Sequence, residues 1–186
     1  IRGDIRDKQL MKQLFQKHKP EIVFHLAAQP LVRESYLKPV ETYETNVLGT
    51  MNILEAIRNS NSVRSAIMVT TDKCYLNKES DVGYNENDSL GGHDPYSSSK
   101  AAAEILIDSY RNSYFNKKTY KEHKTSISSV RAGNVIGGGD WANDRLIPDT
   151  IKSLIGNKNI TIRYPKAVRP WQHVFDLLSG YLELAR

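Results

Sequence analysis

Short apolar segments and amphipathic helical segments alternate along the sequence, and this alternation restricts the possible fold more than any other feature. Segments 21–28, 65–70 and 125–131 consist largely of aliphatic, β-branched and small residues. Such runs are typical of strands that a parallel sheet buries on both faces. The order of the segments predicts an α/β fold with a doubly wound, Rossmann-like parallel sheet and helices on both of its faces.

Five segments have the apolar spacing of amphipathic helices. They cover residues 8–17, 40–59, 97–115, 146–156 and 174–186. Asp7 is suited to cap the first helix. In the third helix, Ala101, Ile105 and Leu106 are expected to face the core. A short additional strand is expected at residues 160–162.

The composition restricts the class of protein. No apolar run approaches the roughly 20 residues of a membrane span, and no His/Cys spacing suits zinc, so we expect neither a membrane segment nor a metal site. Cys74 is the only cysteine, which excludes an internal disulfide and indicates a reducing, cytoplasmic compartment. The net charge of +5 permits nucleic acid or phosphorylated small molecules as partners. The basic segment 117–124 is most simply explained as a solvated surface loop.

Small and polar residues directly follow three of the predicted strands. They are Ala27-Ala28-Gln29, Thr70-Thr71-Asp72-Lys73 and Arg131-Ala132-Gly133-Asn134. Ligands of open parallel sheets bind beyond the carboxyl ends of the strands. We therefore expect the functional site at this edge of the sheet.

A glycine-rich turn is missing from the sequence. A dinucleotide-binding fold needs such a turn after its first strand, where the pyrophosphate meets a helix N-terminus. Gly137-Gly138-Gly139 follows a strand but precedes Asp140 and Trp141 rather than a helical segment. Because Gly3-Asp4 resembles the end of a later strand, we expect the glycine-rich turn upstream of residue 1.

A Tyr and a Lys four residues apart share one face of a helix, where an ammonium can lower the pKa of a phenol and make it a base. This spacing occurs three times, at Tyr96/Lys100, Tyr114/Lys118 and Tyr120/Lys124. The second and third pairs lie at a helix end and in a charged loop, where exposed Tyr and Lys are common. Tyr96 follows Pro95, which is suited to a helix start, so we expect the first pair to be the catalytic one.

Five motifs extend this interpretation. They are residues 24–29 (FHLAAQ), 46–50 (NVLGT), 70–75 (TTDKCY), 95–100 (PYSSSK) and 131–135 (RAGNV). In this order they resemble the extended short-chain dehydrogenases/reductases that act on nucleotide sugars. Segments 70–75, 137–149 and 169–174 are most similar to the dehydratases of this group that use CDP-glucose.

The resemblance implies NAD-dependent dehydration of CDP-glucose to CDP-4-keto-6-deoxyglucose, a lyase reaction of nucleotide-sugar and O-antigen metabolism. Tyr96 would deprotonate the C4 hydroxyl, Lys100 would lower the pKa of Tyr96 and bind the nicotinamide ribose, and Thr71 would hydrogen-bond the reacting oxygen. Asp72 matches the acid that protonates the departing C6 hydroxyl. Lys73 stands where the related dTDP-glucose dehydratases carry Glu, so it is either the base at C5 or an electrostatic stabiliser.

Binding positions carry over in the same way. The matching cofactor positions, besides Tyr96 and Lys100, are Asp4, Ile5, Leu26, Ala27, Ala28, Gln29 and Asn46. The matching substrate positions are Asn134, Arg145, Arg163, Arg169 and Trp171. Arginine suits a diphosphate because its planar fork binds two oxygens at once. Simple packing explains Ala27, Ala28 and Trp171 as well, and a structural role explains Asn46 equally well.

The resemblance also implies the domain organisation. Residues 1–135 would form the NAD-binding core, truncated at its N-terminus, and residues 136–186 part of a smaller substrate-binding lobe interleaved with it. The complete protein is expected to be a homo-oligomer without nucleic-acid or membrane partners. Two alternatives stay open: a dehydratase or epimerase for another nucleotide sugar, and a non-catalytic dinucleotide sensor or RNA-binding protein. The residues that distinguish NAD from NADP are expected upstream of residue 1.

Overall fold

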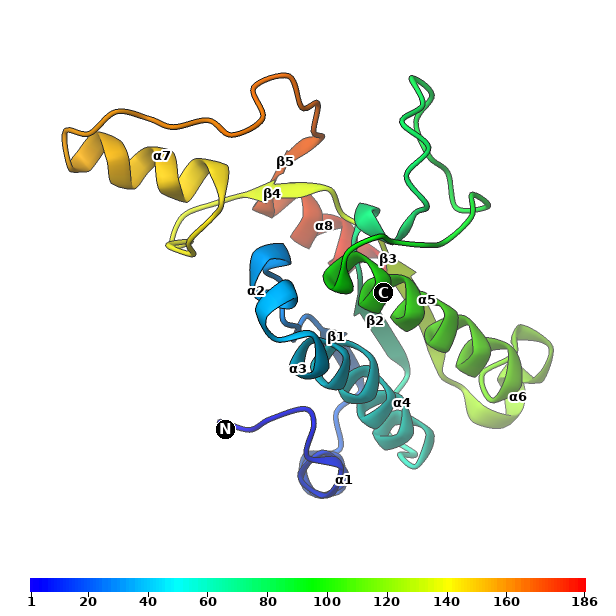
Figure 1. Cartoon of the computed structure of the whole chain (residues 1–186). Helices are drawn as coiled ribbons and strands as arrows, with labels where there is room; N and C mark the ends of the chain where they lie inside the picture. The colour runs from blue at the N-terminus through cyan, green and yellow to red at the C-terminus, as the bar shows by residue number, and fades with distance from the viewer.

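The computed structural model describes all 186 residues and has at its centre a three-stranded parallel sheet. The strands are β1 (Ile22–His25), β2 (Ser65–Val69) and β3 (Ser126–Val130), in the spatial order β1-β2-β3 (Figure 1). Since helices connect the strands and cover both faces of the sheet, the predicted Rossmann-like α/β fold is confirmed.

One face of the sheet carries α1 (Lys8–His18), α4 (Thr50–Arg58) and α5 (Pro95–Ser113) (Figure 1). Their apolar side chains enclose the main core with those of β2 and β3, and its most deeply buried members include Leu54, Met68 and Ile107. Asp7 caps α1 as predicted, because its carboxylate accepts a hydrogen bond from the backbone N–H of Leu10 at 2.9 Å.

The other face is covered more sparsely, by α8 (Val174–Ala185). Tyr181 and Ala185 of α8 pack against Ile67 of β2. Phe24 of β1 lies beside Ile67 on the same face, yet it is 38% exposed, because α8 packs mainly on β2. The expectation that the first strand is buried on both faces is therefore wrong for Ile22 and Phe24.

The predicted helix at residues 40–59 is divided. Helix α2 (Val32–Leu37) precedes α3 (Pro39–Tyr43), and a π-helical turn at Glu44–Gly49 leads into α4. In α5 the prediction that Ile105 faces the core is wrong, because its side chain is 60% exposed. Ala101, Ala103, Glu104 and Ile107 are buried and Leu106 packs against the core, whereas Ile105 points away from this face of the helix.

A second, two-stranded sheet lies beyond the carboxyl edge of the first. It pairs β4 (Asn134–Ile136) with β5 (Trp171–His173) in parallel, and α7 (Leu146–Ile155) lies between them in the chain. The strand predicted at residues 160–162 does not form, because β5 is the strand that pairs with β4 while Ile160 and Ile162 stay exposed. The short helical segments η2 (Asp72–Cys74), η3 (Lys117–Thr119) and α6 (Tyr120–His123) complete the fold. None of the helices combines the length and apolar character that crossing a membrane requires.

Candidate active site

The first turn of α5 places Tyr96 at the carboxyl edge of the sheet. Asp94 caps the helix, and its carboxylate accepts hydrogen bonds from the N–H of Ser97 at 2.9 Å and from the Ser97 hydroxyl at 2.6 Å. Pro95 occupies the first helical position, where its missing N–H costs nothing. The N–H of Tyr96 donates to the hydroxyl of Ser35 at 3.1 Å, which ties the helix start to α2.

Tyr96 and Lys100 are both buried, with exposed fractions of 8% and 6%. Burial raises the pKa of Tyr96, while the neighbouring Thr71 side chain and the charge of Arg145 lower it. The ammonium of Lys100 donates to the backbone carbonyl of Val69 at 3.2 Å. Lys100 is not among the groups that shift the pKa of Tyr96 most, so the expectation that Lys100 lowers this pKa stays a prediction.

The segment after β2 brings three polar side chains to the same place. The hydroxyl of Thr71 donates to the carboxylate of Asp72 at 3.1 Å and accepts from the N–H of Lys73 at 3.3 Å. The Lys73 ammonium lies 5.9 Å from the centre of the Tyr96 ring. Burial lowers the pKa of Lys73. The negative charge of Asp72 opposes this decrease, and the positive charge of Arg169 adds to it.

A cavity of about 1240 Å³ joins this cluster to the second sheet and to the segments around α7. Nine of the predicted residues line it: Thr71, Asp72, Lys73, Tyr96, Asn134, Arg145, Arg163, Arg169 and Trp171. The structure thus brings every predicted substrate position together with four of the five predicted catalytic residues. Lys100 is not part of the lining.

Arg33 also lines this cavity, and sequence reasoning did not identify it. It lies at the start of α2, eight positions beyond the end of β1. Its guanidinium bonds to Asp144 at 2.5 Å, and Arg163 bonds to the same carboxylate oxygen at 2.7 Å. The signal for Arg33 in the sequence is a cation near the start of the helical segment that follows the strand. Trp141 and Tyr164 are further lining residues that were not predicted.

Apart from Tyr96, the predicted cofactor residues lie outside the cavity lining. Asn46, only 1% exposed, accepts from the N–H of Gln29 at 2.8 Å and donates to the Gln29 carbonyl at 3.1 Å and to Ser99 at 2.9 Å. Asn46 therefore fixes the loop after β1 against α5. That loop presents Leu26 and Ala27 as exposed residues, while Ala28 is half-buried.

The remaining predicted cofactor residues, Asp4 and Ile5, lie near the N-terminus. Asp4 is exposed, and its carboxylate is held by Arg6 at 2.6 Å. The carbonyl oxygens of Ile5 and Arg6 accept hydrogen bonds from Asn52 of α4 at 3.0 and 3.1 Å. The Ile5 side chain packs against the main core, so part of this segment also has a structural role.

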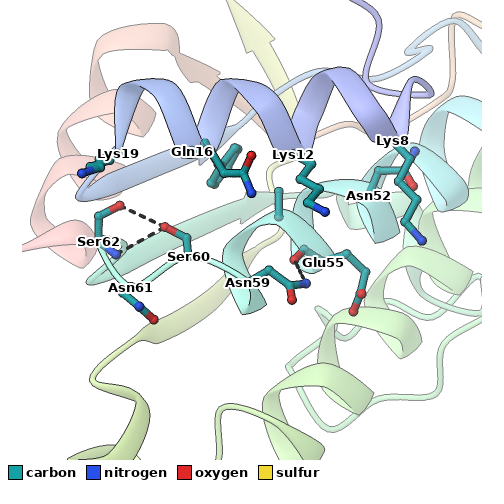
Figure 2. Close-up of a pocket in the computed structure, with 12 residues that line it drawn as sticks. Lys8, Lys12, Gln16, Lys19, Asn52, Glu55, Asn59, Ser60, Asn61 and Ser62 are labelled. Atoms are coloured by element: carbon teal, nitrogen blue, oxygen red, sulfur yellow. Dashed lines mark hydrogen bonds between the residues drawn. The ribbon is translucent and has the colours of Figure 1, made fainter.

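A second cavity, of about 420 Å³, lies between α1 and the C-terminal half of α4. Figure 2 shows the polar side chains that surround it, including Lys8 and Lys12 on α1 and Lys19 directly after this helix. Glu55 on the opposite side is already paired with Arg58 at 2.7 Å. None of the predicted site residues lines this cavity.

The sequence profile of the GDP-mannose 4,6-dehydratase family matches residues 1–185. The chain belongs to this family. Among curated proteins, a CDP-glucose 4,6-dehydratase of Salmonella typhimurium is 52% identical over 99% of this chain and 51% of its own length. A human dTDP-D-glucose 4,6-dehydratase is 34% identical over 100% of this chain and 50% of its own length. The chain thus spans about half the length of these relatives of the GDP-mannose 4,6-dehydratase family.

Solved structures agree with this membership. DesIV, a dTDP-glucose 4,6-dehydratase from Streptomyces venezuelae solved as a double mutant with NAD and DAU bound, matches with a TM-score of 0.83 and 25% identity, over 96% of this chain and 51% of that one. A Thermus thermophilus UDP-glucose 4-epimerase in complex with NAD matches with the same TM-score and identity, over 99% of this chain and 59% of that one. The predicted resemblance to extended short-chain dehydrogenases that act on nucleotide sugars is confirmed.

Proposed function

We propose that this protein carries out the NAD-dependent dehydration of CDP-glucose to CDP-4-keto-6-deoxyglucose. One observation carries the proposal: Thr71, Asp72, Lys73 and Tyr96 line the same cavity as four arginines and Trp171. A cavity of about 1240 Å³ offers ample room for a nucleotide sugar. The 52% identity to a CDP-glucose 4,6-dehydratase supports this choice of substrate over other nucleotide sugars.

In the first step we assign Tyr96 as the base that takes the proton of the C4 hydroxyl. Thr71 lies close enough to Tyr96 to lower the pKa of the phenol, so its hydroxyl can bond to the same reacting oxygen. The positive charge of Arg145 favours the phenolate that this step requires. Ionisation of Tyr96 thus depends on Thr71 and Arg145 to offset the effect of burial.

The second step removes water across C5 and C6. The ketone at C4 makes the C5 proton acidic, so a base removes it while the C6 hydroxyl leaves with a proton from an acid. We assign Asp72 as that acid. Lys73 is half-buried beside Arg169 and Arg145, and its lowered pKa makes the neutral amine more accessible as a base at C5.

The residues at the carboxyl edge of the sheet suit a dinucleotide. Ala27 is exposed at the end of β1 and has only a methyl side chain, so a flat ligand can approach the backbone closely. The hydrogen bonds of Asn46 to Gln29 fix this loop. Asp4, Ile5 and Leu26 would lie along the same ligand, and Lys100 would hold its nicotinamide ribose. The chemistry supplied by bound NAD is removal of hydride from C4 and its return to C6.

We propose that residues 1–135 form the core and residues 136–186 a partial substrate-binding region. The substrate would contact both. Arg145, Arg163 and Arg169 would bind the diphosphate, since guanidinium groups bind two phosphate oxygens at once. Trp171 is 42% exposed where it lines the cavity and offers a flat face to the base or the sugar. We place the protein in the cytoplasm, as a homo-oligomer with no nucleic-acid partner.

The test is incubation of the purified protein and NAD with CDP-, dTDP-, UDP- and GDP-linked sugars, followed by NMR identification of the products. We expect consumption of CDP-glucose and formation of a 4-keto-6-deoxy sugar, with no net change in NAD. Consumption of only another nucleotide sugar would contradict the assignment of the substrate. Salt-dependent RNA binding without any turnover would instead favour a non-catalytic protein.

A further inference from the structure

A buried carboxylate lies one helical turn beyond Lys100 on α5. Glu104 is 3% exposed, and both of its oxygens are bonded. The hydroxyl of Thr70 donates to one oxygen, while the Ser129 hydroxyl and the Arg131 guanidinium donate to the other at 3.1 and 2.9 Å. Four polar groups from α5, β3 and the ends of β2 and β3 thus form one buried network.

Lys100 and Glu104 attach α5 to consecutive residues at the end of β2. The Lys100 ammonium donates to the carbonyl of Val69 at 3.2 Å, and Glu104 accepts from the hydroxyl of Thr70. The next residue in the chain is Thr71. Two side chains of α5 therefore determine how the helix that carries Tyr96 lies against the segment that carries Thr71.

Glu104 remains ionised in this network. Burial by itself would raise its pKa, but the hydrogen bonds from Arg131 and Thr70 outweigh that effect and lower it. Arg131 is fixed in turn by Tyr75, whose hydroxyl accepts from it at 3.0 Å and whose ring lies 4.9 Å below the guanidinium. Arg111 bonds to the Ser129 hydroxyl at 3.2 Å and adds a second positive charge on this side.

Among the ionisable groups around Lys100, Glu104 provides the negative charge near neutral pH. The ionisable groups that influence Lys100, or that it influences, are Glu104 on α5, Cys74 in η2 and His25 on β1. Burial raises the pKa of the Cys74 thiol to about 12 and lowers that of His25 to about 4, so both are neutral near pH 7. Burial lowers the pKa of Lys100 to about 8, and the negative charge of Glu104 opposes this decrease.

We propose that Glu104 is a positioning residue, which keeps Lys100 in its ammonium form at the end of β2 and so maintains the donor assigned to the nicotinamide ribose. That role in catalysis rests on the proposed function. The charge relation between Glu104 and Lys100 does not, because the two residues lie one helical turn apart on α5 and bond to consecutive residues at the end of β2.

The direct test is an NMR titration of Lys100 in lysine-labelled protein, with Glu104→Gln compared to the wild type. Removal of the negative charge should move the Lys100 titration to lower pH, and Glu104→Asp should restore most of the wild-type behaviour. Glu55→Gln is the matched control, because Glu55 also pairs with an arginine and a tyrosine hydroxyl but lies on α4. An unchanged Lys100 titration in folded Glu104→Gln would overturn the proposal.

A measurement on the unmodified protein covers the case in which Glu104→Gln does not fold. The carboxyl carbon of Glu104 should show an ionised group throughout the pH range in which Lys100 titrates. A protonated Glu104 at neutral pH would refute the proposal.

In assays of CDP-glucose turnover, the decline of activity at alkaline pH should occur at lower pH in Glu104→Gln, whereas a purely structural loss would lower activity equally at every pH. If the wild type does not consume CDP-glucose, the proposed function fails while the NMR titration still decides the role of Glu104.

Discussion

The carboxylate of Asp144 and the guanidinium of Arg33 lie 2.5 Å apart, although 111 positions separate the two residues in the chain. Arg163 binds the same carboxylate oxygen at 2.7 Å. Asp144 has a positive φ of 61°, a conformation that Asp and Asn tolerate better than most residues. This ion triad joins α2 to the segments on both sides of α7 at the wall of the large cavity.

Asp144→Asn should raise the KM for CDP-glucose roughly two- to fivefold while changing kcat little. The variant keeps the backbone conformation but no longer holds Arg33 and Arg163 in place for a diphosphate. Steady-state kinetics at low and high salt would measure the effect, which should diminish as salt screens the ion pairs. A decrease in KM would show instead that Asp144 competes with the diphosphate for the two arginines.

Tyr96→Phe should lower kcat by about 10²- to 10⁴-fold, the usual loss when a proton-transferring group is removed. Tyr114→Phe and Tyr120→Phe are matched controls with the same Tyr/Lys spacing, and both side chains are exposed by 46% or more. Their activity should stay at the wild-type level. Because burial raises the pKa of Tyr96, wild-type turnover should increase as the pH rises from neutrality. Equal loss of activity in all three variants would refute the assignment.

Lys73→Ala should separate oxidation from elimination. C4 oxidation should persist, because Tyr96 and Thr71 are unchanged, whereas loss of the C5 proton should slow by about 10²-fold. Rapid-quench analysis and solvent deuterium incorporation at C5 would follow the two steps. Elimination at the normal rate would exclude Lys73 both as the base and as an electrostatic stabiliser.

His25 should make the folded state sensitive to acid. It is buried and hydrogen-bonded to the hydroxyl of Thr50 at 2.9 Å, and burial lowers its pKa from 6.5 to about 4. As the pH falls through this interval, His25 binds a proton in the unfolded chain but not in the folded protein. The free energy of unfolding therefore falls by up to roughly 3 kcal/mol. Urea denaturation across this range should show the decline.

The matched variants separate His25 from the rest of the protein. His25→Gln should remove most of this pH dependence, whereas His18→Gln, at an exposed position on α1, should keep it. The same slope in all three proteins would assign the acid sensitivity to other groups.

Local sequence patterns determined most of the secondary structure. Apolar periodicity predicted β2, β3, α1, α7 and α8, although α7 leaves most of its apolar side chains exposed. The pattern failed where a neighbour decides the outcome. Residues 160–162 have strand-like composition, but a strand forms only where another strand accepts its hydrogen bonds, and β5 is the partner of β4. Ile105 is apolar but lies outside the buried stripe of α5.

The types of chemistry available follow from the residues themselves: a phenol, a hydroxyl, a carboxylate and several cations at strand ends and at the start of a helix. Which of these groups meet depends on the three-dimensional fold. It grouped Thr71, Asp72, Lys73 and Tyr96 with distant arginines around one cavity, and it directed Lys100 to Val69 and the counter-charge of Glu104. The reason is physical, since residue types follow from local sequence, whereas burial and the distance between charges depend on packing between segments far apart in the chain.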